Sequence, residues 1–471
     1  MRQRFLLTVR QLLPRVGLVA AALLILTAPR PRALDAALSQ PSAATPSQRL
    51  EALIIALRYL PNDPILVRRA YDAAFAAKRL DVADAFATHL AQAGFSVTLH
   101  RLFAELRSAQ GNRLAALAHH QAALQGSDED IPHLRVLADA ALLNAEWDNA
   151  REYLTRILAY TPNDPWVLYR LGLLSAPESS SIAEGFFVQL PERSDYAALA
   201  PLQAAMANYA NTLGGEYAFR IGLALLEGDE PLYAEHAFRI AQSQTSSIPA
   251  VEAFLAVSLA RNGRDGLPTL QRAINAAPND VLVLLAAGIY WRIVGNVELA
   301  LDSLRNASAI APNNAAIAAE IGAVYRSGGF LPQAAEWYAR AVALAPDDES
   351  IWRAAAAFYV DENYGLGGEG LNFARTAVER FPQSAELAAT YGYALLNNAQ
   401  VEAARAELQR ALSISPNNVR ARYYFAVLME HQQQWENAVE SYQYVVAHAP
   451  RSALGERATR ALARLNQPVN N

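Results

Sequence analysis

The chain has 471 residues, long enough for two or three ordinary domains, and a formal net charge of −5 at pH 7. Basic and acidic residues are interspersed, so the sequence lacks the concentrated positive charge that marks a nucleic-acid-binding protein. It contains no cysteine, which excludes disulfides, thiol chemistry and a lipid-modified cysteine anchor.

The N-terminal segment combines a basic start with an apolar core. The apolar run from Val16 to Leu26 is too short for a spanning helix, which needs about 20 residues, and fits the core of a secretory signal. We therefore predict that residues 1–39 are a signal peptide or, alternatively, an uncleaved membrane anchor. Both place the body outside the cytoplasm, because more arginines precede the run than follow it. The preceding arginines are Arg2, Arg4, Arg10 and Arg15.

A short linker, residues 40–46, leads into a region of weak helical repeats at 47–174. Pro61 and Pro162 lie 101 residues apart, nearly three times the pitch of about 34 residues that is found further along the chain. A leading helix is expected at Ser47–Leu60. The phase then breaks between 175 and 215, where either a degenerate repeat carries an insertion or a boundary divides two sub-arrays.

This break offers two interpretations, a loose surface insertion or a binding loop. Its charged residues include no histidine, cysteine or lysine, which weighs against catalysis there. They are Glu178, Glu184, Glu192, Arg193 and Asp195.

Residues 216–466 contain the sharpest periodicity. Successive prolines are separated by 34, 34, 36, 34 and 34 residues, and each period predicts two helices of about 12–14 residues. The proline closes each second helix, and the Asn or Asp residues that follow it cap the next. The last helix, Ser452–Leu465, is expected to close the array with a solvated arginine face, and 467–471 form a tail. The prolines are Pro278, Pro312, Pro346, Pro382, Pro416 and Pro450.

The repeat pattern resembles the tetratricopeptide repeat, a helix–turn–helix unit of 34 residues. The first helix carries Ile321, Gly322 and Tyr325, and the second carries Ala334 and Tyr338. This resemblance implies an all-α, right-handed superhelical solenoid of about eleven units. The repeats leave no stretch of about 100 residues for a catalytic domain, so we expect a protein that is not an enzyme.

Three local motifs are interpreted as structural. Gly365–Gly370 formally matches a dinucleotide loop, but it is expected to join two helices of one repeat rather than to follow a strand. His119 and His120 are adjacent on a second helix, so they should not face one metal ion. Asp128–Asp130 is expected to be a solvated acidic turn. No cofactor or metal site is predicted.

The resemblance further implies that the first helices line a concave groove that binds partner peptides or helices. Arginine and tyrosine are frequent interface hot spots, so an extended peptide with acidic and apolar groups is expected. The positions that match the family's ligand-facing places and form the predicted site are Arg292, Arg326, Arg353, Tyr393, Asn397, Arg420, Tyr423 and His431.

We therefore predict a non-catalytic scaffold or adaptor for protein partners, outside the cytoplasm, with membrane contact only through the N-terminal segment. One alternative is an assembly factor for an envelope polysaccharide-export or secretion complex. Another is the regulatory arm of an enzyme.

Overall fold

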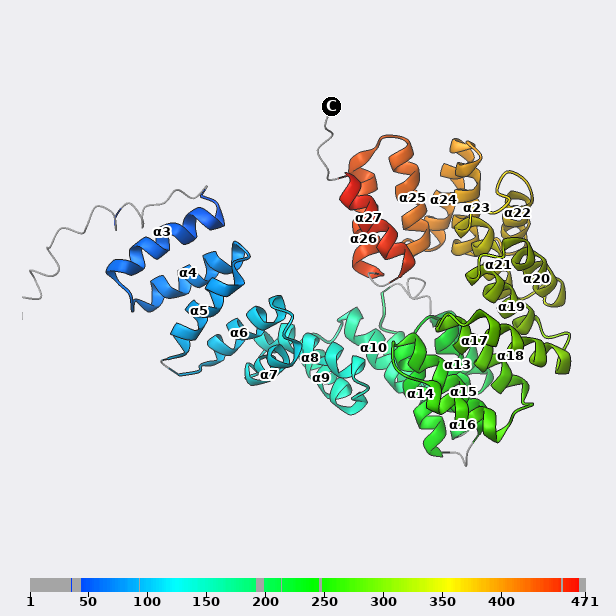
Figure 1. The fold of residues 1–471 in the computed structure, drawn as a ribbon, viewed down its shortest axis with the longest axis horizontal. Coiled ribbons are helices and arrows are strands. Elements are labelled where there is room, and N and C mark those ends of the chain that lie inside the picture. Colours follow the sequence, from blue (N-terminus) through cyan, green and yellow to red (C-terminus); the bar gives the residue numbers. More distant parts are fainter. Residues whose placement is uncertain are drawn as a thin grey trace, which may run out of the picture. The chain divides into compact units, whose positions relative to one another are not determined.

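A computed structural model describes Asp35 and residues 44–92, 94–191, 199–212, 214–244, 248–449 and 452–465. The predicted signal or anchor lies outside these residues apart from Asp35, so its role stays a prediction. The described chain is helical throughout, and it divides within α8, after Ala141, into an N-terminal unit and a C-terminal unit (Figure 1).

The N-terminal unit begins with the single helix α3 and continues as helix pairs. Its elements are α3 (Pro46–Tyr59), α4 (Pro64–Ala76), α5 (Leu80–Ala91), α6 (Val97–Ala109), α7 (Arg113–Ala122), the 3-10 turn η1 (Asp128–Asp130) and α8 (Ile131–Leu143).

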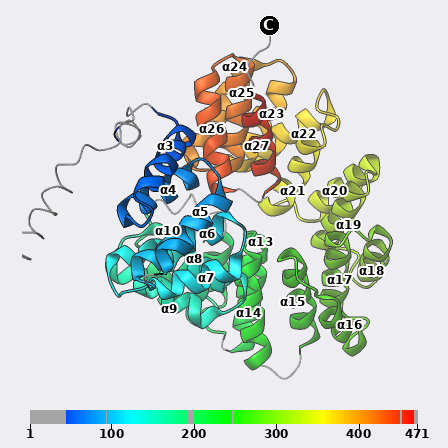
Figure 2. The same cartoon turned by 60° about the vertical axis from the view of Figure 1, so that its left-hand side comes forward.

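The C-terminal unit holds the remaining helices, and pairs follow one another in chain order (Figure 2). They are α9 (Trp147–Tyr160), α10 (Pro165–Ser175), α11 (Ser180–Phe187), α12 (Leu199–Asn208), α13 (Gly215–Glu227), α14 (Pro231–Gln244), α15 (Pro249–Arg261), α16 (Leu267–Ala276), α17 (Val281–Ile293), α18 (Val297–Ile310), α19 (Ala315–Ser327), α20 (Leu331–Leu344), α21 (Glu349–Asp361), α22 (Glu369–Arg380), α23 (Ala385–Asn397), α24 (Val401–Ile414), α25 (Val419–His431), α26 (Trp435–His448) and α27 (Ala453–Leu465).

These helices confirm the predicted all-α stack of helix pairs. The described residues hold ten packed pairs, α4–α5, α6–α7, α10–α11 and α13–α14 to α25–α26, together with the helices α3, α8, α9, α12 and α27. No described helix is both long and apolar enough to cross a bilayer.

Prolines and caps set the helix boundaries as predicted. Helix α18 ends at Ile310, two residues before Pro312. The next helix starts after Asn314, whose side chain accepts hydrogen bonds from the Ala316 and Ile317 amides. These bonds satisfy amides that have no partner inside the helix. Equivalent caps stand before α4, α10, α17, α21 and α25, at Asp63, Asp164, Asp280, Asp348 and Asn418.

The eighth residue of each first helix sets how closely its partner approaches. A Cβ atom at Gly288 would lie 2.4 Å from Leu304 Cγ, and one at Gly322 would lie 3.2 Å from Tyr338 Cγ. Each large residue stands sixteen positions after its glycine. A bulky substitution at Gly322 would therefore overpack the helix pair and lower the free energy of unfolding by about 1–3 kcal/mol. The same place holds Gly172, Gly222 and Gly392, and alanine at 104, 138, 256, 356 and 426.

The first complete pair, α4–α5, reverses this arrangement. The eighth residue of α4 is Tyr71, and Ala87 stands sixteen positions later on α5. Both are buried, with exposed fractions of 2% and 0%. The Tyr71 hydroxyl donates to the Leu102 carbonyl on α6 at 3.2 Å. The large and small side chains have thus exchanged helices while the pair stays closely packed.

The broken phase at 175–215 contains the second helix of one pair, α11, and one additional helix, α12. A Cβ at Gly172 would lie 2.2 Å from the ring of Phe187, so α10 and α11 pack as the regular pairs do. The offset between these residues is fifteen instead of sixteen. Helix α12 follows and packs on α13. The segment therefore includes the second helix of a slightly shortened repeat.

Two contacts connect α9 and α10 to the start of α14, past this additional helix. The Tyr169 hydroxyl donates to Glu230 Oε1 at 2.7 Å. Burial raises the pKa of Glu230 to about 7, although the Tyr169 hydrogen bond and Arg170 oppose the shift. His236 on α14 packs against the Trp147 ring, with centroids 4.8 Å apart, and burial lowers its pKa to about 4.

Candidate interaction surface

The first helices of the C-terminal unit stack directly on one another. Helices α17, α19, α21, α23, α25 and α27, here called the inner row, contact their successors in turn. Each second helix packs on its own first helix and on the next one. Figures 1 and 2 show α17 and α19 on the inner side of α18 and α20.

Arginine–carboxylate pairs run along the inner row. The Arg292 guanidinium on α17 lies 2.9 Å from Glu320 on α19. Arg326 on α19 pairs with Glu362, at the end of α21, at 2.7 Å. Each pair joins one first helix to the next, and we call the series the arginine ladder.

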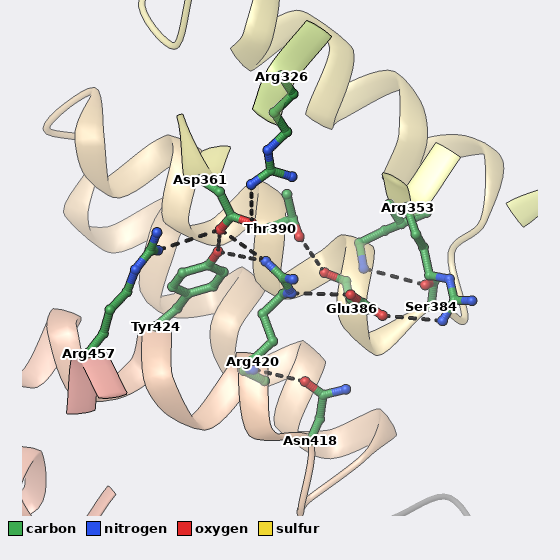
Figure 3. A network of polar contacts seen from close by, with 12 residues as sticks. Arg326, Arg353, Asp361, Ser384, Glu386, Thr390, Asn418, Arg420, Tyr424 and Arg457 are labelled. Atoms are coloured by element: carbon green, nitrogen blue, oxygen red, sulfur yellow. Dashed lines mark hydrogen bonds and ion pairs between the residues drawn. The ribbon is translucent and has the colours of Figure 1, made fainter. Parts of the chain in front are cut away.

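The ladder converges on the carboxylate of Asp361, at the C-terminal end of α21 (Figure 3). Arg326 from α19 and Arg420 from α25 each approach it to 3.3 Å. Arg457 from α27 lies at 3.8 Å, and the Tyr424 hydroxyl donates to it at 3.2 Å. With 13% of its side chain exposed, Asp361 is largely withdrawn from water.

A second carboxylate extends this network. Glu386 on α23 accepts from Arg353 and from Arg420, both at 3.2 Å. Burial lowers the pKa of Arg420, but Tyr424, Glu386 and Asp361 raise it by more, so its net pKa lies above the ordinary value. The guanidinium therefore stays charged, and the pairs compensate for its desolvation.

Tyrosine rings border the network. Tyr393 on α23 stacks on Tyr424, with ring centroids 4.3 Å apart. Tyr423 packs against Tyr442, with centroids 5.8 Å apart. Tyr442 donates to Glu430 at 3.0 Å. Partly exposed rings beside guanidinium groups offer apolar and cationic contacts within one surface.

The predicted site residues thus fall into four groups. Arg326, Arg353 and Arg420 belong to one network, which Tyr393 adjoins, and Arg292 lies in a separate pair. Tyr423 belongs to the second ring cluster. Asn397 and His431 are exposed at the C-terminal ends of α23 and α25, where Asn397 Nδ2 donates to the Tyr393 carbonyl at 2.9 Å. Their part in binding stays a prediction.

Two features of this surface differ from the sequence prediction: the position of one arginine on α27, and the carboxylate of Glu386, which was not predicted. Of the α27 arginines that were expected on a solvated outer face, Arg460 and Arg464 are exposed, although Arg464 also pairs with Glu430 on α25, whereas Arg457 faces Asp361. Glu386 was not identified. It lies 33 residues from Arg353 and 34 from Arg420. Opposite charges one repeat length apart are the signal that identifies such pairs.

The other motifs are placed within the repeats. Gly365 lies between α21 and α22, after a helix as expected, and Gly370 packs against the Tyr364 carbonyl. His119 and His120 contact different partners, His100 and His133. The prediction of a solvated acidic turn at 128–130 is confirmed for Asp128 and Glu129, which are exposed, and was wrong for Asp130.

Asp130 is fully buried, with 0% of its side chain exposed. It accepts the backbone amides of Gln125 and Gly126 at 2.8 and 2.7 Å. Burial raises its pKa, but these amides and Arg101 lower it by more. A carboxylate that accepts several amides is stabilised in its charged form, which explains how Asp130 can be buried.

The repeat spacing and the helix pairs together give the described chain the fold of a tetratricopeptide-repeat solenoid. No family model and no curated protein matches the sequence. Among solved structures, yeast Tom70 is 13% identical with a TM-score of 0.43, covering 85% of this chain and 95% of its own. A tetratricopeptide repeat protein from Parabacteroides merdae is 12% identical with a TM-score of 0.41, covering 54% of this chain and 99% of its own. At these scores the likenesses say nothing about partner or activity.

Proposed function

We propose that the chain is a non-catalytic scaffold that works outside the cytoplasm and binds a partner protein along the inner row. The convergence of several arginines on Asp361 carries the proposal. Arg326, Arg353, Arg420 and Arg457 pair with the carboxylates of Asp361, Glu362 and Glu386. Arg353 also lies near the carboxyl of Glu227 and lowers its pKa, against the larger effect of burial. Arg457, with its single contact at 3.8 Å, is the least neutralised of the four guanidinium groups and favours the approach of an acidic group.

Arg457 is the ladder residue best placed to contact a partner. Its side chain is 38% exposed, and its distance of 3.8 Å from Asp361 makes it the weakest contact of that carboxylate. Tyr423 lies nearby, since Arg457 lowers the pKa of that tyrosine against the larger effect of burial. An acidic side chain from a partner can therefore pair with Arg457 while an adjacent apolar group packs on the tyrosine ring.

The ladder also limits how the partner binds. Arg326, Arg353 and Arg420 already hold carboxylates of their own chain, so their charges are largely neutralised. A ligand gains most at the rim, where displacing an internal pair is unnecessary. The partner we propose is an extended segment or helix with acidic and apolar groups. The extracytoplasmic location rests on the predicted signal or anchor at residues 1–39.

Cross-linked purification from the native cell envelope tests this proposal. Wild type is compared with Arg457→Gln and with Arg305→Gln, a control on α18 whose side chain is 60% exposed. We expect Arg457→Gln to lose the partner that wild type and the control retain, with unchanged helical circular dichroism. If wild type and both variants retain the partner equally, the proposal that the partner binds along the inner row is wrong. A partner that migrates with the chain as a stable membrane complex would favour the assembly-factor alternative.

A further inference from the structure

The two ends of the repeat array differ in their outward surfaces. On the closing helix α27 the exposed side chains are small or polar, and they include Glu456, Arg460 and Arg464. A terminal repeat needs such a surface because no further repeat covers it. The leading helix α3 lacks this property, since its outward face carries large apolar side chains.

Five large apolar residues are exposed where α3 meets α4. On a helix, positions 54, 55, 58 and 59 share one face, and the turn to α4 follows directly. Ile65 stands in the first turn of α4. We call these residues the N-terminal apolar end: Ile54, Ile55, Tyr59, Leu60 and Ile65, with exposed fractions of 36%, 39%, 47%, 43% and 69%.

Basic side chains accompany this surface. Arg58 projects from the same face of α3, and Arg69 is exposed on α4. Within the described residues neither forms an ion pair. Arg68, also exposed, pairs with Asp72 at 3.0 Å. Apolar groups combined with unpaired arginines are typical of surfaces that lie at the boundary of an anionic bilayer.

We infer that the N-terminal apolar end lies against the surface of a lipid bilayer with anionic headgroups. This inference rests on the membrane anchoring or export proposed above. The predicted apolar segment ends at Leu26, and α3 begins at Pro46, nineteen intervening residues later. Even fully extended, nineteen residues reach no more than about 65 Å, which would keep α3 within that distance of a bilayer that holds the segment.

Charge favours a bilayer over a second copy of the chain. In a two-fold contact the same surface meets itself, so the Arg58 and Arg69 side chains of both copies would gather in one interface. Anionic headgroups instead place opposite charge beside both guanidinium groups. Tyr59 suits the interface as well, because its ring is apolar and its hydroxyl is polar.

The absence of cysteine makes the full chain suitable for a labelling test. Ile55→Cys is labelled with an environment-sensitive fluorophore, and Leu114→Cys is the control, since Leu114 is an 83% exposed apolar residue of the same unit outside this surface. The proteins are added to zwitterionic vesicles and to vesicles that contain anionic lipid. We expect blue-shifted emission and protection from iodide only for Ile55→Cys on anionic vesicles. Equal iodide quenching of both labels on anionic vesicles would overturn the inference.

Further experiments distinguish bilayer contact from self-association of the chain, and test separately whether the chain is anchored to a membrane. Adding Arg58→Gln and Arg69→Gln to the labelled protein should reduce the blue shift, whereas Arg113→Gln should not. Concentration-dependent self-quenching of the Ile55 label without lipid would assign the surface to a second copy and overturn the bilayer assignment. Flotation of wild type with vesicles tests anchoring itself. A chain that floats while the Ile55 label stays in water contradicts this inference alone, and one that never floats contradicts the anchoring proposal.

Discussion

The N-terminal and C-terminal units share one way of packing helix pairs but join neighbouring helices with different polar groups. In the N-terminal unit, His100 Nδ1 lies 3.0 Å from His119 Nδ1, and His120 Nδ1 lies 2.8 Å from His133 Nδ1. The N-terminal unit also has arginine–carboxylate pairs, such as Arg107 with Asp84 at 2.8 Å, but in the C-terminal unit it is these pairs, and not histidine pairs, that join the described helices of the inner row. A hydrogen bond between imidazoles requires at least one neutral ring, whereas guanidinium and carboxylate groups stay charged at neutral pH. We therefore expect a change of pH to alter mainly the stability of the N-terminal unit, and the loss of a carboxylate to alter mainly the stability of the C-terminal unit.

The position of His120 explains why a titratable group lies in the core. It stands sixteen residues after Ala104, the same offset that separates Gly288 from Leu304 and Gly322 from Tyr338. His120 therefore occupies the place of the large apolar residue and is only 6% exposed. Hydrogen bonding to His133 satisfies one of its ring nitrogens, as a buried polar group requires.

The largest expected effect comes from the reversed pair. Tyr71→Ala should destabilise the N-terminal unit by about 3–4 kcal/mol, because it leaves a cavity and removes the hydrogen bond to Leu102. Urea unfolding followed by circular dichroism measures this loss. Combining Tyr71→Gly with Ala87→Phe restores the glycine–phenylalanine order of α13–α14 and should recover about half of it. A cost no larger than that of Tyr59→Ala would show that the position is not closely packed.

The Asp361 network should give the next largest effect, in the C-terminal unit. Asp361→Ala leaves Arg420, only 19% exposed, with one carboxylate fewer, and should cost about 2–3 kcal/mol. Asp302→Ala, on the exposed face of α18, is the control and should change stability by less than about 0.5 kcal/mol. Hydrogen exchange should show the loss in α19 to α27. Similar losses of stability in both variants would mean that the Asp361 network stabilises the fold no more than an exposed ion pair does.

Acid should loosen the N-terminal unit between pH 6.5 and about 4. Burial, together with the smaller effect of the nearby His133 ring, lowers the pKa of His120 from 6.5 to about 4. The unfolded chain then binds more protons than the folded one in this range, so stability falls as pH falls. Burial lowers the pKa values of His119 and His133 as well, and His100 and Arg107 add to the shift of His119. Arg101 lowers the pKa of His133, and Asp130 raises it.

Replacing one histidine pair tests this pH dependence. His120→Leu with His133→Leu puts an apolar residue at the core position and removes both titrating rings. We expect protection of α6 to α8 from hydrogen exchange at pH 5 to rise by about 1–2 kcal/mol relative to wild type. His448→Gln, in an exposed position of the C-terminal unit, should leave that protection unchanged. An identical acid response in wild type and the double variant would exclude the His120–His133 pair as its source.

The smallest expected effect comes from Glu230, and it lowers stability as pH rises, whereas the histidines lower stability as pH falls. The pKa of Glu230 is raised from 4.5 to about 7, so the folded chain holds a proton that the unfolded chain releases. Stability of the α10–α14 junction should therefore fall as pH rises from 4.5 to 7. Glu230→Gln keeps an acceptor for Tyr169 and should stabilise the C-terminal unit by about 1 kcal/mol at pH 8. No stabilisation at pH 8 would show that Glu230 reaches enough water to ionise freely.

The sequence predicted the helix pairs well where local chemistry determines them. The proline pitch located the pairs from α17 onward, because a proline and the following cap define a boundary within a few residues. The pairing of the ladder could not be predicted in the same way. The position of Arg353 in its repeat indicates a face, but its partner Glu386 lies 33 residues away and becomes a neighbour only when the repeats stack. Likewise, Phe187 lies fifteen residues after Gly172 instead of sixteen, so the regular spacing does not indicate that these two residues are in contact.

The four-way junction at Asp361 has a consequence for cooperativity. In an ideal repeat array each unit interacts only with its nearest neighbours. Asp361 on α21 instead contacts Arg420 on α25 and Arg457 on α27, which lie two and three first helices further along. Such long-range coupling should make the last units of the array melt together as one block rather than fray from the C-terminus. A partner that binds this block would therefore meet a surface already ordered, and would lose little entropy in fixing it.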